Sequence, residues 1–120
     1  MPYNYDALEP YIDEQTVTIH HDKHQGKYVN NTLSFIKGTV LDGESLETII
    51  KTAYLTNYTE LYNNAAQVYN HQFYWKSMAS NGGGEPTGMV LKMINKHLGN
   101  YTNFRTQFID AGSAVFGSGW

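Results

Sequence analysis

The stretch that decides the fold spans residues 14–37 and reads EQTVTIHHDKHQGKYVNNTLSFIK. Apolar, aromatic and histidine side chains recur in it every three or four residues, which predicts a long amphipathic α-helix. The recurring positions are Val17, His20, His24, Tyr28, Val29, Leu33 and Ile36. Asp13 is a suitable amino-terminal cap for this helix, and Gly38 is a suitable stop. Gly26 lies inside the helix, where a glycine costs about 1 kcal/mol relative to alanine.

A second helical pattern covers about residues 60–78. Gln67, His71 and Trp75 follow one another in steps of four, so they share one side of the expected helix. The predicted apolar side consists of Leu61, Ala65, Val68, Phe73 and Trp75. If the two helices pack side by side, they could aim one histidine from each, His20 and His71, at a single metal ion.

The clearest boundary in the chain is residues 81–86, which read NGGGEP. Glycine clusters followed by proline mark turns and linkers. Ahead of this boundary we also expect an extended arm over residues 1–12, because Pro2 and Pro10 disfavour helix before them. A short amphipathic helix is expected to start near Leu46.

Beyond the boundary, the pattern predicts two further helices, one from Thr87 to Leu98 and one from about Thr102 to Val115. No stretch predicts a strand, so the chain is expected to be mainly α. We therefore expect two domains, residues 1–82 and residues 83–120.

The composition excludes several classes of function. The chain has 120 residues, a net charge of −3 and no basic stretch, which argues against nucleic acid as a partner. It has no cysteine, which excludes disulfides, thiolate nucleophiles and zinc–cysteine sites. No apolar run is long enough to span a membrane, and the first residues carry no secretory signal. We expect a cytoplasmic protein that contacts neither nucleic acid nor a membrane.

The histidines leave several roles open. Imidazole is the commonest metal ligand, and Fe, Mn, Zn and Cu all accept it. A lone histidine on an apolar helix face, however, is more often a hydrogen-bonded core residue. His24 has three interpretations, namely a ligand, a hydrogen-bonding gate residue or a solvated side chain. His21 lies about 100° from His20 around an α-helix and is expected outside. His97, near a predicted helix end, can face the negative helix terminus.

Other catalytic chemistry finds little support. His20 and His24 have the spacing of a zinc-protease helix, but the glutamate that acts as the general base is missing between them. The glycine run is not preceded by a strand or followed by Lys-Ser/Thr, so it is not a nucleotide-binding loop. Ser118 lacks the strand–turn–helix context of a serine nucleophile.

Several motifs, taken in order, resemble the amino-terminal part of the iron/manganese superoxide dismutases over nearly the whole chain. They are Pro2-Tyr3, Asp6-Ala7-Leu8-Glu9-Pro10, His20-His21-Asp22-Lys23-His24, Tyr28-Val29-Asn30-Asn31, Asn63-Asn64-Ala65-Ala66-Gln67-Val68, Asn70-His71-Gln72-Phe73-Tyr74-Trp75, Gly84-Glu85-Pro86-Thr87-Gly88 and Phe116-Gly117-Ser118-Gly119-Trp120.

The resemblance implies a long α-helical hairpin followed by the first helices of an α/β domain, with one metal ion per subunit held between the domains. In this resemblance His20 and His71 match two of the metal ligands. Tyr28 and His24 match residues at the mouth of the substrate channel, close to the partner subunit of a homodimer. Gln67 matches the outer-sphere glutamine that hydrogen-bonds the metal-bound solvent, and its position on this helix is typical of the iron-type members.

The implied activity is the dismutation of superoxide to oxygen and hydrogen peroxide, with iron as the cofactor and manganese as the alternative. Trp75 and Trp120 match aromatic residues that wall the site. The chain departs from the family in lacking the Asp-x-Trp-Glu-His motif with the other two ligands and in lacking the sheet. The metal site is therefore expected to be incomplete, and the chain alone to be inactive. Gln25 stands where the family usually has a second consecutive histidine, and we favour surface drift over the alternative of an altered channel mouth or dimer contact.

The leading interpretation is a fragment of an iron-type superoxide dismutase. Two alternatives remain. One is a naturally short, non-catalytic relative that works as a binding or assembly module. The other is half of a split enzyme, in which a separate chain supplies the missing aspartate and histidine.

Overall fold

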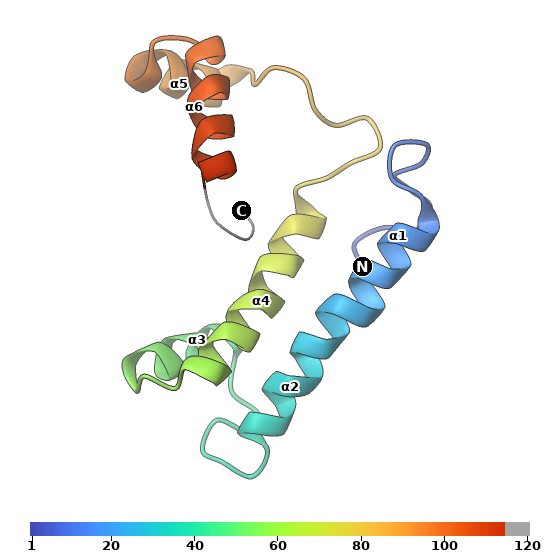
Figure 1. Ribbon diagram of the computed structural model, residues 1–120, viewed down its shortest axis with the longest axis vertical. Coiled ribbons are helices and arrows are strands. Elements are labelled where there is room, and N and C mark those ends of the chain that lie inside the picture. The colour runs from blue at the N-terminus through green and yellow to red at the C-terminus, as the bar shows by residue number, and fades with distance from the viewer. Residues whose placement is uncertain (115–120) are drawn as a thin grey trace. The chain divides into compact units, whose positions relative to one another are not determined.

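The computed structural model describes residues 1–114, and every regular element in this range is a helix (Figure 1). The expectation of a mainly α chain is confirmed. The helices divide into two compact units, one up to Gly82 and one from Gly83 onward. The first unit carries all the candidate site residues that lie within the described range.

The first arm of the hairpin is one continuous helical rod of three parts: α1 (Glu14–Thr18), the π-helical segment η1 (Ile19–Gln25) and α2 (Gly26–Ile36). The carboxylate of Asp13 accepts a hydrogen bond from the amide of Thr16 at 2.7 Å, which caps the first turn. Gly38 follows the rod with φ 72°, a backbone angle that favours glycine. The predicted helix is therefore right in its extent, but its middle is wound differently from an α-helix.

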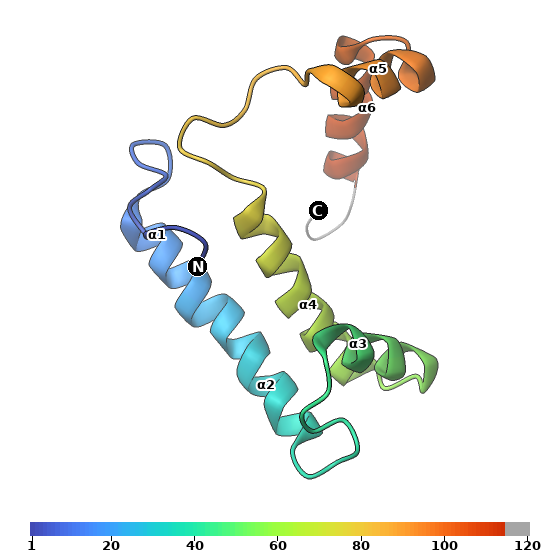
Figure 2. The same cartoon turned by 180° about the vertical axis from the view of Figure 1, so that it is seen from behind.

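The second arm is α4 (Thr59–Lys76), which lies alongside α2 in both views of the hairpin (Figures 1 and 2). A shorter helix, α3 (Leu46–Leu55), packs against α4. Their shared core consists of the buried residues Ile36, Ile49, Ala53, Leu61 and Ala65. A second cluster of Leu8, Val17 and Trp75 lies at the α1 end of the hairpin. Burial of these apolar side chains holds the two arms at a fixed spacing.

Two expectations about the hairpin are wrong. Residues 5–11 form successive turns where an extended arm was expected, and the amide of Ala7 donates to the carbonyl of Asn4 at 3.1 Å. These turns bury Leu8 against Trp75. Phe73 is 68% exposed and does not belong to the buried side of α4. His71 and Trp75 occupy that side, and a residue two positions from each of them points away.

The second unit contains α5 (Gly88–Leu98) and α6 (Tyr101–Ala114), which pack against each other. Gly99 between them has φ 85°. The boundaries match the predicted helices closely, although Val115 lies outside the described residues. None of the helices within residues 1–114 combines the length and apolar character needed to cross a membrane. The identity of this unit as the start of an α/β domain remains a prediction.

Candidate metal centre

The hairpin brings one histidine from each arm into direct contact. His20 lies in η1 and His71 in α4, and their Nε2 atoms are 3.1 Å apart. The two ring centroids are 5.0 Å apart and the rings are almost perpendicular, at 83°. The two histidines are 51 positions apart in the sequence, so this is a tertiary contact, fixed by the packing of the arms.

The spacing of the two nitrogens fits two ligands of one ion. Two imidazole nitrogens, each about 2.1 Å from a metal and subtending about 90–110°, lie roughly 3.0–3.4 Å apart. The observed 3.1 Å falls in this interval. Neutral imidazole is also a chemically suitable donor for first-row transition metals. His20 and His71 therefore fit a shared metal ion in both geometry and chemistry.

His71 is oriented by its own helix. It is 4% exposed, and its Nδ1 atom lies 2.7 Å from the backbone carbonyl oxygen of Gln67, one turn earlier. A carbonyl only accepts, so Nδ1 of His71 carries the proton and Nε2 presents its lone pair. This is the usual way in which a protein fixes a histidine for metal binding.

The hydrogen bond from His71 to Gln67 also determines which histidine donates in the contact between the pair. In its neutral form His71 has no proton on Nε2, so Nε2 of His20 donates the hydrogen bond that joins them. A metal ion can bind both nitrogens only if the proton of His20 lies on Nδ1, and a second proton on that ring would compete with the metal. Burial, together with the neighbouring imidazoles of His71 and His24, lowers the pKa of His20 below its ordinary value of 6.5. The lowered pKa favours the uncharged ring that a metal requires.

The other predicted site residues lie around the pair at different depths. Tyr28 is half-buried, and its ring centroid is 5.5 Å from that of His71. His24 is exposed, 6.0 Å from His20 between ring centroids, and the two border a surface hollow with Thr16 and Ile19. No side-chain hydrogen bond links Tyr28 or His24 to the histidine pair within residues 1–114.

Gln67, Trp75 and Trp120 were the other residues expected around the metal site. Gln67 is half-buried and contributes its backbone carbonyl to the orientation of His71. Trp75 is 3% exposed and lies edge-on against His20, with 5.0 Å between ring centroids. Trp120 lies outside the described residues. Among residues 1–114, no group of three or more His, Asp and Glu side chains is arranged to hold a metal ion.

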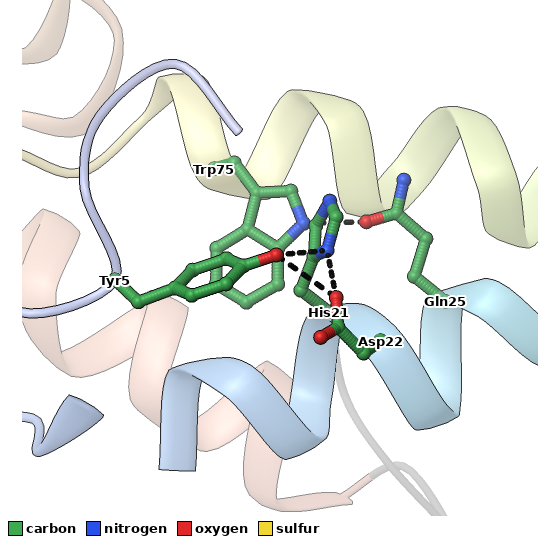
Figure 3. Close-up of polar contacts among 5 residues, drawn as sticks. All are labelled: Tyr5, His21, Asp22, Gln25 and Trp75. Carbon is green, nitrogen blue, oxygen red and sulfur yellow. Dashed lines mark hydrogen bonds and ion pairs between the residues drawn. The ribbon is translucent and has the colours of Figure 1, made fainter. Parts of the chain in front are cut away.

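Gln25 was missed as a site residue, and its interpretation as surface drift is wrong. Its side chain is 8% exposed, and its amide oxygen accepts a hydrogen bond of 2.6 Å from the indole Nε1–H of Trp75 (Figure 3). The π-helical winding of η1 explains why Gln25 is buried. The amide of Gly26 donates to the carbonyl of His21, five residues back, so the turn holds more residues than an α-helical turn. As a result, Gln25 faces α4 and His24 faces solvent.

His21 was expected on the outside of the helix and is instead a contact residue of the site. Its side chain is 27% exposed, and its ring centroid is 6.0 Å from that of Trp75. Its Nδ1 lies 2.8 Å from the carboxylate of Asp22, which also accepts a hydrogen bond of 2.9 Å from the hydroxyl of Tyr5 (Figure 3). The hydrogen bonds from His21 and Tyr5 lower the pKa of Asp22. This network fastens the amino-terminal turns to η1.

The chain is similar in sequence to known proteins along its full length. A family model described as iron/manganese superoxide dismutases, alpha-hairpin domain, matches residues 1–79. Iron superoxide dismutases of Synechococcus elongatus and Escherichia coli are each 47% identical to it, over 121 and 120 residues, and that of Synechocystis is 46% identical over 121 residues. Each match covers 100% of this chain and 60% or 61% of the relative, so the chain spans about 60% of the length of these relatives. From the matched hairpin domain and these relatives, it follows that the chain belongs to the iron/manganese superoxide dismutase family.

Proposed function

We propose that this chain forms the helical-hairpin part of an iron-dependent superoxide dismutase, and that His20 and His71 are two of the metal ligands. The observation that carries the proposal is the 3.1 Å separation of the two Nε2 atoms. Three relatives named as iron superoxide dismutases support iron over manganese, as does the position of Gln67 on α4. The substrate would be superoxide, and we propose a homodimer for the complete protein.

The bound iron would supply the redox chemistry, oxidising one superoxide to oxygen in the ferric state and reducing a second one, with two protons, to hydrogen peroxide in the ferrous state. Everything else in the reaction depends on the protein. His20 and His71 would hold the ion through their Nε2 atoms. The carbonyl of Gln67 keeps the proton of His71 on Nδ1, which leaves Nε2 available for the metal.

Proton supply is the second task of the chain, because peroxide formation consumes protons. Tyr28 lies beside His71 and His24 lies beside His20, so each of these polar side chains is next to one of the two proposed ligands. His24 is exposed and Tyr28 is half-buried, which suits a path from solvent toward the pair. In this proposal the side-chain amide of Gln67 would hydrogen-bond solvent at the site and tune how readily that solvent takes up a proton.

Two neutral imidazoles do not satisfy the coordination number and charge of a ferric ion. Among residues 1–114, no third His, Asp or Glu side chain is arranged with this pair to hold a metal. We therefore expect the isolated chain to bind divalent metal weakly and to show no dismutase activity.

The test is metal binding by the isolated chain. Zn²⁺ is a suitable redox-inert probe, because it accepts imidazole nitrogen and tetrahedral geometry. We expect His20→Ala and His71→Ala each to weaken Zn²⁺ binding at least about tenfold by isothermal titration calorimetry, since each removes one of two ligands. His97→Ala, a substitution of an exposed histidine in α5, is the matched control and is expected to leave the affinity unchanged. Equal affinities in all four proteins would contradict the proposed site.

A further inference from the structure

Trp75 is held by a polar contact as well as by packing. Its side chain is 3% exposed, and the indole Nε1–H donates to the amide oxygen of Gln25 across the hairpin at 2.6 Å. Figure 3 shows Gln25 reaching from η1 toward the indole of α4, with His21 beside both. Gln25 is itself 8% exposed. Breaking such a bond leaves a buried donor without its partner, so Gln25 strongly restrains the indole.

The two histidines of the pair differ in what orients them. His71 is tied to the carbonyl of Gln67, whereas Nδ1 of His20 has no hydrogen-bond partner in the part of the chain that the structure describes. The ring of His20 instead lies against two neighbouring aromatic rings of α4, with centroid distances of 5.0 Å to Trp75 and 5.5 Å to Tyr74. A histidine that binds metal usually needs a fixed neighbour to set its ring angle. For His20 this neighbour is an aromatic wall.

The π-helical winding of η1 makes the connection possible. His20 and Gln25 are five residues apart, and in a π-helix residues at this spacing lie above one another on the same side. Both therefore face α4, His20 toward His71 and Gln25 toward Trp75. One short segment thus supplies both a proposed ligand and the group that fixes the wall behind it.

We propose that Gln25 is a positioning residue, which fixes the indole of Trp75 and thereby holds the ring of His20 toward His71. The proposal rests on the proposed function in taking the histidine pair as a metal site. It predicts that removing the acceptor oxygen of Gln25 frees the indole, loosens His20 and weakens metal binding, although Gln25 touches neither histidine through a hydrogen bond.

The test compares the parent chain with three variants. Gln25→Met keeps a long unbranched side chain but removes the acceptor oxygen, whereas Gln25→Glu keeps an oxygen at the same distance from the backbone. Gln15→Met is the matched control, because Gln15 is exposed in α1. Two quantities are measured, namely the solvent exchange of the Trp75 indole proton by NMR and the Zn²⁺ dissociation constant by calorimetry. The spectrum of Trp75→Phe assigns the indole signal.

We expect Gln25→Met to speed indole exchange and to weaken Zn²⁺ binding by about tenfold, the lower end of the effect of groups that orient metal ligands. Gln25→Glu is expected to restore both quantities toward those of the parent, and Gln15→Met to change neither. Recovery by glutamate would assign the effect to the acceptor oxygen, because glutamate keeps the shape of glutamine and an oxygen at the position where methionine has no acceptor of that kind.

Two results overturn the proposal. One is faster indole exchange with unchanged Zn²⁺ affinity, because the bond would then hold Trp75 without acting on His20. The other is unchanged indole exchange in Gln25→Met. If Gln25→Met loses its helical circular dichroism, Gln25→Asn replaces it, since its amide falls one methylene short of the indole. Failure of the proposed function has a different signature, because the parent chain would then bind Zn²⁺ no better than His71→Ala does. In that case the proposal for Gln25 is also wrong.

Discussion

The two arms of the hairpin present their histidines in opposite ways. α4 is a regular helix that buries His71 and ties its ring to a carbonyl of the same helix. η1 departs from α-helical winding and leaves His20 half-buried against aromatic rings. The first arrangement depends on one turn of one helix, whereas the second depends on side chains from both arms. A helix can therefore orient a histidine locally or through tertiary packing, and the second way is the more easily disturbed.

Among substitutions that test how the two arms hold their histidines, Trp75→Ala is expected to lower the unfolding free energy the most. The substitution removes a side chain that is 3% exposed and packs on Leu8, Val17 and His20. Truncation of a buried tryptophan typically costs about 3–5 kcal/mol of unfolding free energy. Phe73→Ala is the matched control, because Phe73 is 68% exposed on the same helix and should cost about 0.5 kcal/mol or less. Urea denaturation measures both, and a similar loss in the two variants would contradict the role of Trp75.

A smaller loss of unfolding free energy is expected when a hydrogen bond between the two arms is removed. The side-chain amide of Asn31 in α2 donates to that of Asn64 in α4 at 2.9 Å. We expect Asn31→Ala to lower the unfolding free energy by about 1 kcal/mol, the usual net worth of one hydrogen bond. Asn30→Ala makes the same change at the neighbouring exposed position and so cancels the difference in helix propensity. If the two variants unfold at the same urea concentration, the bond does not help to hold the arms together.

The smallest expected effect is a dependence of stability on pH that comes from His20, in the first arm. Burial and the nearby imidazoles of His71 and His24 lower the pKa of His20 below 6.5, so in that range the unfolded chain binds more protons than the folded one. Stability from this source is complete above about pH 6.5 and is lost as the pH falls toward the lowered pKa. We expect the unfolding free energy to fall between pH 7 and pH 5, and His20→Gln to flatten this slope.

Two carboxylates with lowered pKa values do not interfere in this range. Asp13 caps α1 and Asp22 accepts from His21 and Tyr5, and each loses its stabilising charge only below about pH 4. His97→Gln serves as the control for removing a histidine, since His97 is exposed in the second unit. A slope that is the same in His20→Gln and in the parent would contradict the assignment to His20.

The sequence was sufficient to predict the helices and the meeting of His20 with His71. Hydrophobic periodicity, the Asp13 cap and the glycine at position 38 delimit the first rod, and all three depend on local physics. The pairing of the two histidines followed from placing each in the inward stripe of its helix. Their contact at 3.1 Å is the structural counterpart of that prediction, whereas their role as ligands stays a prediction.

The sequence was not sufficient to predict the winding of η1. A template of 3.6 residues per turn puts His24 on the same side as His20, and the structure puts Gln25 there. The π turn brings Gln25 into a hydrogen bond with Trp75 across the hairpin, and local periodicity contains no trace of that tertiary contact. The sole available signal was a polar residue next to a glycine at positions 25 and 26, in the middle of an otherwise continuous helix.

A π turn in the middle of an α-helical rod is equivalent to one inserted residue. α1 and α2 each keep regular packing, while their angular phase about the rod axis is offset by the extra residue. A single-codon insertion or deletion within η1 is therefore enough to exchange the residue that meets Trp75 without redesigning either flanking helix.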